Sequence, residues 1–269
     1  MTTLVAFHAH PDDEAIATGG AMKIAADAGH RVVLVTATRG EQGEPRAGVL
    51  REGEALWERR VVETERSAAI LGIEGVRFLG YEDSGMIGEP TNDNPACFWQ
   101  ADIEEAAERL AVILREVDCG VLTIYDEHGG YGHPDHIQVH RVGRRAAELT
   151  GVTEIFQATM NRDRIMAMME AQAAGDIGEE FEARRSRFEE SPFGMPEADI
   201  THAIDVSSAV DVKRQSMVAH ASQIGDDSFF MQMPPEAFAQ AFGTEWFVKL
   251  DARRAADEPF GTSLFPSAD

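Results

Sequence analysis

Strand-like and helix-like segments alternate through residues 1–158, and this alternation constrains the fold more than any other feature of the sequence. Short apolar runs predict buried strands at 4–7, 31–38, 76–79, 120–125 and 154–158. Longer segments with helical spacing of apolar residues predict helices at 14–29, 50–71, 101–116 and 134–149. Such alternation is typical of parallel strands joined by crossover helices. We therefore expect an α/β fold with a Rossmann-like, mostly parallel sheet flanked by helices.

Residues 159–269 are patterned less regularly and predict an α+β extension of that core. Helices are expected at 162–173 and 209–222, strands at 201–206 and 246–250, and a loose tail from Ala252. A chain of 269 residues is within the range of a single domain. We expect residues 1–269 to form one domain, in which the extension completes a pocket on the core of residues 1–158.

Composition and charge limit the partners that this chain can have. Its 47 acidic and 24 basic residues give a net charge of −23, which disfavours nucleic acid and anionic membrane surfaces, because both attract basic patches. No run approaches the ~20 apolar residues of a membrane span, and residues 1–8 lack the features of a signal peptide. Two cysteines cannot build a disulfide framework. We expect a cytoplasmic protein that binds a small molecule and can form a homo-oligomer.

The sequence His-Pro-Asp occurs twice, each time directly after a predicted strand. The first copy is HPDDE at positions 10–14, and the second is HPDH at positions 133–136. Ligand sites of open parallel sheets lie outside the carboxyl ends of the strands, so both motifs fall on the edge where a site is expected. No glycine-rich dinucleotide fingerprint follows the first strand, so the predicted fold alone does not support nucleotide binding.

The residue types in these motifs predict a catalytic metal centre. His10 and Asp13 are three positions apart, as are His133 and His136, and residues at this spacing share one face of a helix. Two imidazoles and one carboxylate, with one position open to water, are typical of catalytic zinc, and Fe²⁺ accepts the same ligands. We assign His10, Asp13 and His136 as ligands. Spacing alone also allows His133 in place of His136, and the assignment leaves Asp12 and His133 free for acid–base chemistry.

Both motifs resemble the signatures of the PIG-L (LmbE-like) de-N-acetylase family. The segments that carry this resemblance are AHPDDE at 9–14 and GYGHPDH at 130–136. Shorter matches are GEQGE at 40–44, Arg60-x-x-Glu63 and HASQ at 220–223, while DSGM at 83–86 is similar to the substrate loop of the mycothiol-pathway deacetylases. The resemblance spans residues 4–223. It implies zinc-dependent hydrolysis of an acetamide on an amino sugar, with one Zn²⁺ per chain.

The resemblance also implies a role for each matching residue. It places Zn²⁺ on His10, Asp13 and His136, and it makes Asp12 the general base. It places Tyr131 and His133 beside the oxyanion. Arg60 and Asp83 would grip the hydroxyl-bearing rings of the substrate. From its position beside His133, Asp135 is expected to accept a proton from that ring and fix its orientation.

The leading hypothesis is removal of an N-acetyl group from an N-acetylglucosamine-type sugar or its conjugate, such as N-acetylglucosaminyl-inositol. One alternative is an amidase of mycothiol S-conjugates, although Ala17 stands where that branch carries a lysine. A second is a zinc-dependent hydratase on the same fold. A third is a metal-bearing module that binds sugar without turnover.

Overall fold

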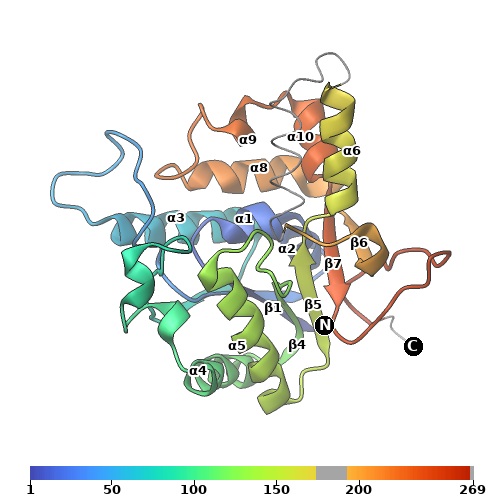
Figure 1. Ribbon diagram of the computed structural model, residues 1–269, viewed down its shortest axis with the longest axis horizontal. Coiled ribbons are helices and arrows are strands. Elements are labelled where there is room, and N and C mark those ends of the chain that lie inside the picture. Colours follow the sequence, from blue (N-terminus) through green and yellow to red (C-terminus); the bar gives the residue numbers. More distant parts are fainter. Residues whose placement is uncertain (174–192, 267–269) are drawn as a thin grey trace.

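Residues 1–173 and 193–266 are described by the computed structural model, and across them the chain forms one seven-stranded sheet (Figure 1). The strands lie in the order β3-β2-β1-β4-β5-β7-β6. Their bounds are β1 Thr3–His8, β2 Arg31–Thr36, β3 Gly75–Phe78, β4 Cys119–Tyr125, β5 Glu154–Thr159, β6 His202–Asp205 and β7 Thr244–Lys249. Strands β1 to β5 pair in parallel, whereas β7 is antiparallel to both of its neighbours, β5 and β6.

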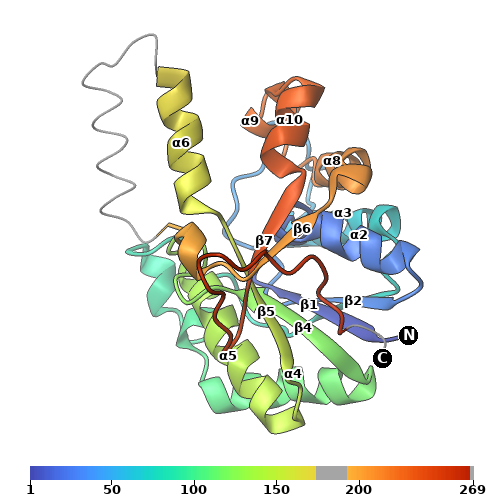
Figure 2. The same ribbon diagram turned by 90° about the vertical axis from the view of Figure 1, so that its right-hand side faces the viewer.

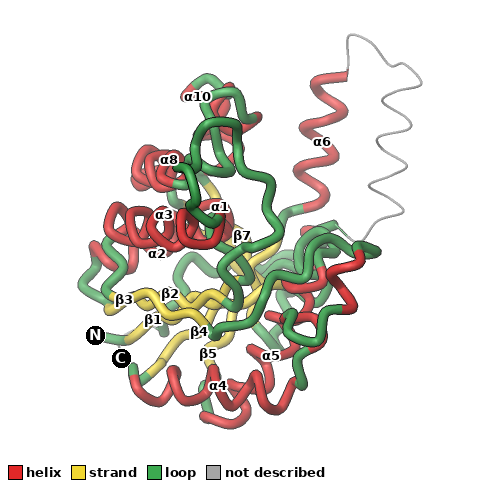
Figure 3. The backbone as a smooth tube through the Cα atoms, turned by 90° about the vertical axis from the view of Figure 1, so that its left-hand side faces the viewer, coloured by secondary structure: helices red, strands yellow, loops and turns green. Residues whose placement is uncertain are grey.

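Helices cover both faces of this sheet (Figures 2 and 3). Helices α4 and α5 lie against one face, and α1, α2, α3 and α8 lie on the other. The helices are α1 Asp13–Ala17, α2 Gly19–Asp27, α3 Leu56–Leu71, α4 Ile103–Glu116, α5 Pro134–Thr150, α6 Arg162–Ala173, α8 Val210–Ala219, α9 Phe229–Gln232 and α10 Pro235–Phe242. Among the described residues, no helix is both long enough and apolar enough to span a bilayer.

The central strands carry apolar side chains along their whole length because both faces of the sheet are covered. In β1, Leu4, Val5, Ala6 and Phe7 are fully buried, and parallel strands buried on both faces are characteristically continuous apolar runs. The predicted α/β fold with a mostly parallel sheet is confirmed. Strand β1 pairs with β2 on one side and with β4 on the other, so the strand order reverses between β1 and β4. Such a switch point is where ligands bind in this class of sheet.

The structure differs from the sequence-based prediction at the first helix. The helix expected at 14–29 is two helices, α1 and α2, which meet at Thr18 with φ −135°. The break frees the first backbone N–H groups of α2, and the Glu245 carboxylate accepts hydrogen bonds from Gly20 and Ala21, both at 2.8 Å. Because Glu245 is more than 220 positions away, helical periodicity alone could not reveal this break.

The C-terminal region differs from the sequence-based prediction in two ways. Helices α9 and α10 were not predicted. The tail expected to be loose packs on the body: Gly261 accepts a backbone hydrogen bond from Ala203 at 2.9 Å, and the Phe265 ring stacks on His30 with centroids 3.7 Å apart. These contacts pair the tail with segments far away in sequence, which its composition does not indicate.

Candidate metal centre

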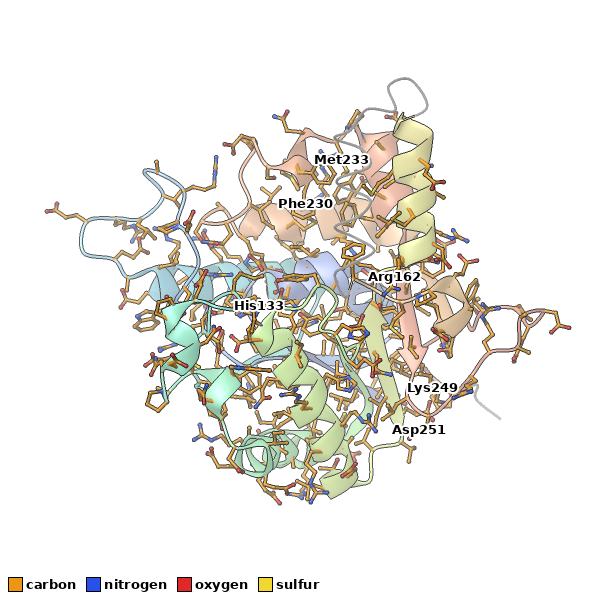
Figure 4. The ribbon with its side chains drawn as sticks, viewed as in Figure 1. His133, Arg162, Phe230, Met233, Lys249 and Asp251 are labelled. Carbon is orange, nitrogen blue, oxygen red and sulfur yellow. The ribbon has the colours of Figure 1, made fainter. Side chains whose placement is uncertain are left out.

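The two His-Pro-Asp motifs meet at the switch point of the sheet. Strand β1 ends at His8, two residues before the first motif, and the second motif begins at His133, the N-cap of α5 (Figure 4). Since β1 and β4 are hydrogen-bonded neighbours, their carboxyl ends bring the motifs together although 123 positions separate His10 from His133.

The two predicted imidazole ligands both face one oxygen of the predicted carboxylate ligand. Asp13 Oδ2 lies 3.4 Å from His10 Nδ1 and 3.3 Å from His136 Nε2. Ligand atoms ~2.1 Å from a tetrahedral zinc ion are about 3.4 Å apart, so each of these two separations fits a pair of ligands on one ion. The groups whose ligand atoms all lie within 4.8 Å of one another are His10 with His133 and His136, and His10 with Asp83 and Asp135. The His10 backbone N–H also donates to Asp13 Oδ2 at 2.8 Å, which holds the carboxylate in place.

The charges around these ligands also fit a bound cation. Burial lowers the pKa of His10, but Asp83, Asp13 and Asp135 raise it well above its usual range. Burial raises the pKa of Asp13, but His136 and His10 more than offset this and bring it well below its usual value. A pocket of buried carboxylates is costly without a compensating positive charge, which a divalent metal would supply.

His133 lies beside the ligands, and its hydrogen bonding distinguishes it from them. One ring nitrogen of His133 and one each of His10 and His136 lie within 4.8 Å of one another, close enough to share a metal ion. However, His133 Nδ1 accepts the Asp135 backbone N–H at 3.1 Å, and burial lowers the pKa of the ring to about 3. A neutral ring that accepts at Nδ1 carries its proton on Nε2. That tautomer makes Nε2 a hydrogen-bond donor and takes away the lone pair that a metal would need there.

The contact expected between the Asp135 carboxylate and His133 is replaced by a different arrangement. Asp135 Oδ2 faces His10 Nε2 at 3.1 Å and accepts the Ser84 backbone N–H at 2.9 Å, while Ser84 Oγ donates to Oδ1. Asp135 meets His133 through its backbone because N–H groups in the first turn of a helix point back to the N-cap residue. Its carboxylate therefore orients His10, the role that a carboxylate commonly plays behind a metal-bound imidazole.

The two predicted substrate-binding residues lie at the site but are buried. Asp83 Oδ1 lies 3.4 Å from His10 Nε2, and the Asp83 carboxylate also accepts the backbone N–H groups of Gln42 and Gly85. Arg60 donates to the Gly40 carbonyl at 2.9 Å, and its Nη2 lies 3.2 Å from Asp12 Oδ2. Both side chains therefore support other residues of the site.

Asp12 and Tyr131 complete the set of predicted residues. Burial raises the pKa of Asp12 to about 6, although the adjacent Arg60 guanidinium opposes the shift. Tyr131 is 44% exposed at the rim, and its hydroxyl lies 3.5 Å from His136 Nε2. Burial of the hydroxyl and the nearby Asp13 raise its pKa, so the phenol is protonated at neutral pH.

Tyr125 supports the site and was not identified by the sequence analysis. The Tyr125 ring stacks on His136 with centroids 4.3 Å apart and an interplanar angle of 8°. Its hydroxyl is hydrogen-bonded to His8 Nδ1 at 2.7 Å. The only signal available was its place at the end of a predicted strand, which also describes residues with no role in a site.

A mostly parallel sheet flanked by helices, with a histidine–aspartate centre at its switch point, is typical of metal-dependent α/β enzymes. The family described as "PIG-L: GlcNAc-PI de-N-acetylase" matches residues 5–147, a segment that contains both His-Pro-Asp motifs. The chain belongs to the PIG-L family, and it is an amide hydrolase like its relatives that are named deacetylases. The resemblance inferred from the sequence motifs is thereby confirmed.

Named relatives match almost the whole chain. A protein of Acidothermus cellulolyticus named 1D-myo-inositol 2-acetamido-2-deoxy-alpha-D-glucopyranoside deacetylase is 42% identical over 262 residues, covering 93% of this chain and 89% of the relative. A protein of the same name from Thermobifida fusca is 39% identical over 284 residues, covering 97% and 98%. The solved N,N'-diacetylchitobiose deacetylase of Pyrococcus horikoshii superposes with a TM-score of 0.58 at 20% identity, covering 91% of this chain and 82% of that one. This last likeness shows the fold.

Proposed function

We propose that this enzyme removes the N-acetyl group of N-acetylglucosaminyl-inositol, releasing acetate and the free amino sugar. The main observation behind the proposal is that His10 and His136 both face Asp13 Oδ2. Asp12, which directly precedes Asp13 in the sequence, adds a second carboxylate to the site. The names of the relatives that match almost the whole chain support this substrate. The reaction needs an activated water, a proton acceptor and a group that stabilises a negative oxygen, and the site offers residues for each.

His10, Asp13 and His136 would hold one divalent cation per chain. Zinc is the proposed ion, and the imidazole and carboxylate donors also suit Fe²⁺. When bound, such an ion polarises the acetamide carbonyl and acidifies water at the site. We assign His136 over His133 as the second imidazole because His133 Nδ1 already accepts the Asp135 N–H.

Asp12 is the proposed general base. Its carboxylate would take a proton from the attacking water and return it to the leaving amine, which must be protonated to depart. A base works best when its pKa lies near the working pH, and burial places that of Asp12 at about 6. The contact with Arg60 at 3.2 Å fixes the carboxylate in one orientation.

His133 and Tyr131 are the proposed donors to the oxyanion of the tetrahedral intermediate. The Nε2–H of neutral His133 and the hydroxyl of protonated Tyr131 can both donate a hydrogen bond there, and such a donor contributes about 10²–10³ to the rate. Asp83 and Arg60 would hold hydroxyl groups of the substrate.

We also propose that residues 159–269 belong to the same domain as the core. Strands β7 and β6 continue its sheet, and His220 is hydrogen-bonded to Glu14, the last residue of the first motif. The proposed compartment is the cytoplasm. The acidic composition and the two free cysteines support it.

The test is release of free amine from N-acetylglucosaminyl-inositol by the zinc-loaded protein, with Asp12→Asn as the matched control. We expect turnover by the wild type, loss of most turnover in the variant, and one zinc per chain in both. Turnover of the variant at the wild-type rate would remove Asp12 as the base. A zinc-loaded wild type that releases no amine from this sugar would refute the proposed substrate.

A further inference from the structure

The backbone of Asp12 adopts a conformation that its side chain disfavours. Its φ is +91° and its ψ is −28°, in the left-handed region where a Cβ atom crowds the backbone. Asp118 and Asp251 are the other non-glycine residues of the described segments with positive φ. A residue keeps such a conformation when its surroundings hold it there, so the contacts around Asp12 identify what holds it.

Both polar groups of the Pro11–Asp12 peptide are held by buried side chains. Arg60 Nη2 donates to the Pro11 carbonyl at 2.5 Å, and the Asp12 N–H donates to Glu14 Oε2 at 3.0 Å. A peptide group is planar, so fixing its carbonyl and its N–H fixes its plane. That plane sets φ of Asp12 and with it the direction in which the Asp12 side chain leaves the backbone.

Glu14 is itself immobilised from two other helices. Its Oε1 accepts hydrogen bonds from Ser67 Oγ of α3 at 2.5 Å and from His220 Nε2, just after α8, at 2.6 Å. All three side chains are fully buried. The Glu14 carboxylate therefore connects the Asp12 backbone to two helices that lie 53 and 206 positions further along the chain.

We propose that Glu14 is a positioning residue for the general base, held in place by Ser67 and His220. It acts through the Asp12 N–H: it keeps the Pro11–Asp12 peptide in the plane that directs the Asp12 carboxylate toward the reacting water. The effect of Glu14 on catalysis rests on the proposed function, whereas its effect on the backbone conformation of Asp12 does not.

A second buried glutamate offers a matched control. Glu63 of α3 accepts the Ser222 N–H at 3.0 Å and the Ser222 hydroxyl at 2.6 Å, and it is 1% exposed. It resembles Glu14 in burial and in joining α3 to the turn after α8, but its carboxylate bonds to Ser222 and not to the His-Pro-Asp motif. Glu63→Ala therefore shows how far kcat and Tm fall when a buried carboxylate is lost but the hydrogen bond to the Asp12 N–H is kept.

The experiment compares Glu14→Ala, Glu14→Gln and Glu63→Ala in the full-length zinc-loaded protein. The measurements are kcat, KM, zinc stoichiometry, Tm and the crystal structure of each variant. We expect Glu14→Ala to lower kcat by about 10–100-fold, the effect typical of losing a supporting residue behind an active site, with KM and zinc content near the wild type. In its crystal structure Asp12 should leave the left-handed region. Glu14→Gln retains an oxygen for the Asp12 N–H and should recover most of the loss.

Several results would overturn the proposal. One is a Glu14→Ala variant with unchanged kcat, and another is an equal fall of kcat in Glu63→Ala. If Glu14→Ala gives no folded protein, His220→Ala takes its place with the same expectations. If the wild type does not act on the sugar, the proposed function fails, and the Asp12 φ angle in the variant structures alone decides this inference. An unchanged angle then refutes it.

Discussion

Replacing Glu245 should destabilise the protein strongly, because this carboxylate serves three buried donors at once. It accepts the N–H groups of Gly20 and Ala21 at the start of α2, each at 2.8 Å, and the Lys213 ammonium at 2.5 Å. Lys213 and Glu245 are 1% and 4% exposed. Glu245→Gln would leave the Lys213 ammonium in the interior facing a neutral amide.

The size of the effect follows from that burial. Removing one partner of a buried ion pair costs about 3–5 kcal/mol because the other charge is left uncompensated. Lys213→Met should cost less, about 1–3 kcal/mol, since the two α2 N–H groups still stabilise the Glu245 carboxylate. The double variant removes both charges, so its loss should be smaller than the sum of the two by about 2–3 kcal/mol, as neighbouring residues are not additive.

Urea unfolding at pH 7 measures each free energy of unfolding, and coincident transitions by two probes check that the process is two-state. Lys249 and Glu154 form the matched control, because they are paired at 2.7 Å but 30% and 24% exposed. Glu154→Gln should cost ~1 kcal/mol or less, as partly exposed pairs do. The reasoning is refuted if Glu245→Gln costs no more than Glu154→Gln, or if the two losses at Lys213 and Glu245 simply add.

Three other perturbations test the site and its support. His136→Ala should lose bound zinc, whereas His133→Ala should keep it and lower kcat by about 10²–10³-fold; zinc analysis of both variants separates ligand from oxyanion donor, and equal zinc loss would contradict the assignment. Dialysis against EDTA should abolish amine release and added Zn²⁺ should restore it, so full activity after metal removal would exclude the proposed role of the metal. Gly20→Ala would place a Cβ atom 2.5 Å from Val206 Cβ and should cost about 1–3 kcal/mol by overpacking; Val206→Ala should recover part of that loss in urea unfolding, and no recovery would rule out this clash as the cause.

Features that depend on local sequence were predictable. Continuous apolar runs identify the buried strands β1, β2 and β4 because both faces of a parallel sheet are covered. The two His-Pro-Asp motifs locate the site because the strand before each one ends at the same edge. Strand direction was less accessible: nothing in the side-chain pattern of Thr244–Lys249 indicates that β7 runs antiparallel to β5.

Partners distant in sequence could not be predicted in the same way. Asp135 was expected to orient His133, yet its carboxylate meets Ser84 and His10, because the loop after β3 lies against the start of α5. The hydrogen bond from His220 to Glu14 joins residues 206 positions apart. Only the packing of α8 beside α1 and α3 creates it, and a single sequence does not encode that arrangement in any local pattern.

The supports supplied by the C-terminal region limit how far this enzyme can be reduced in size. The family match ends at residue 147, which would suggest a minimal catalytic fragment containing both His-Pro-Asp motifs. Such a fragment would lack Glu245, which caps α2, and His220, which braces Glu14. Protein engineers who transplant this centre into another scaffold therefore need to carry over α8 and β7 together with the two motifs.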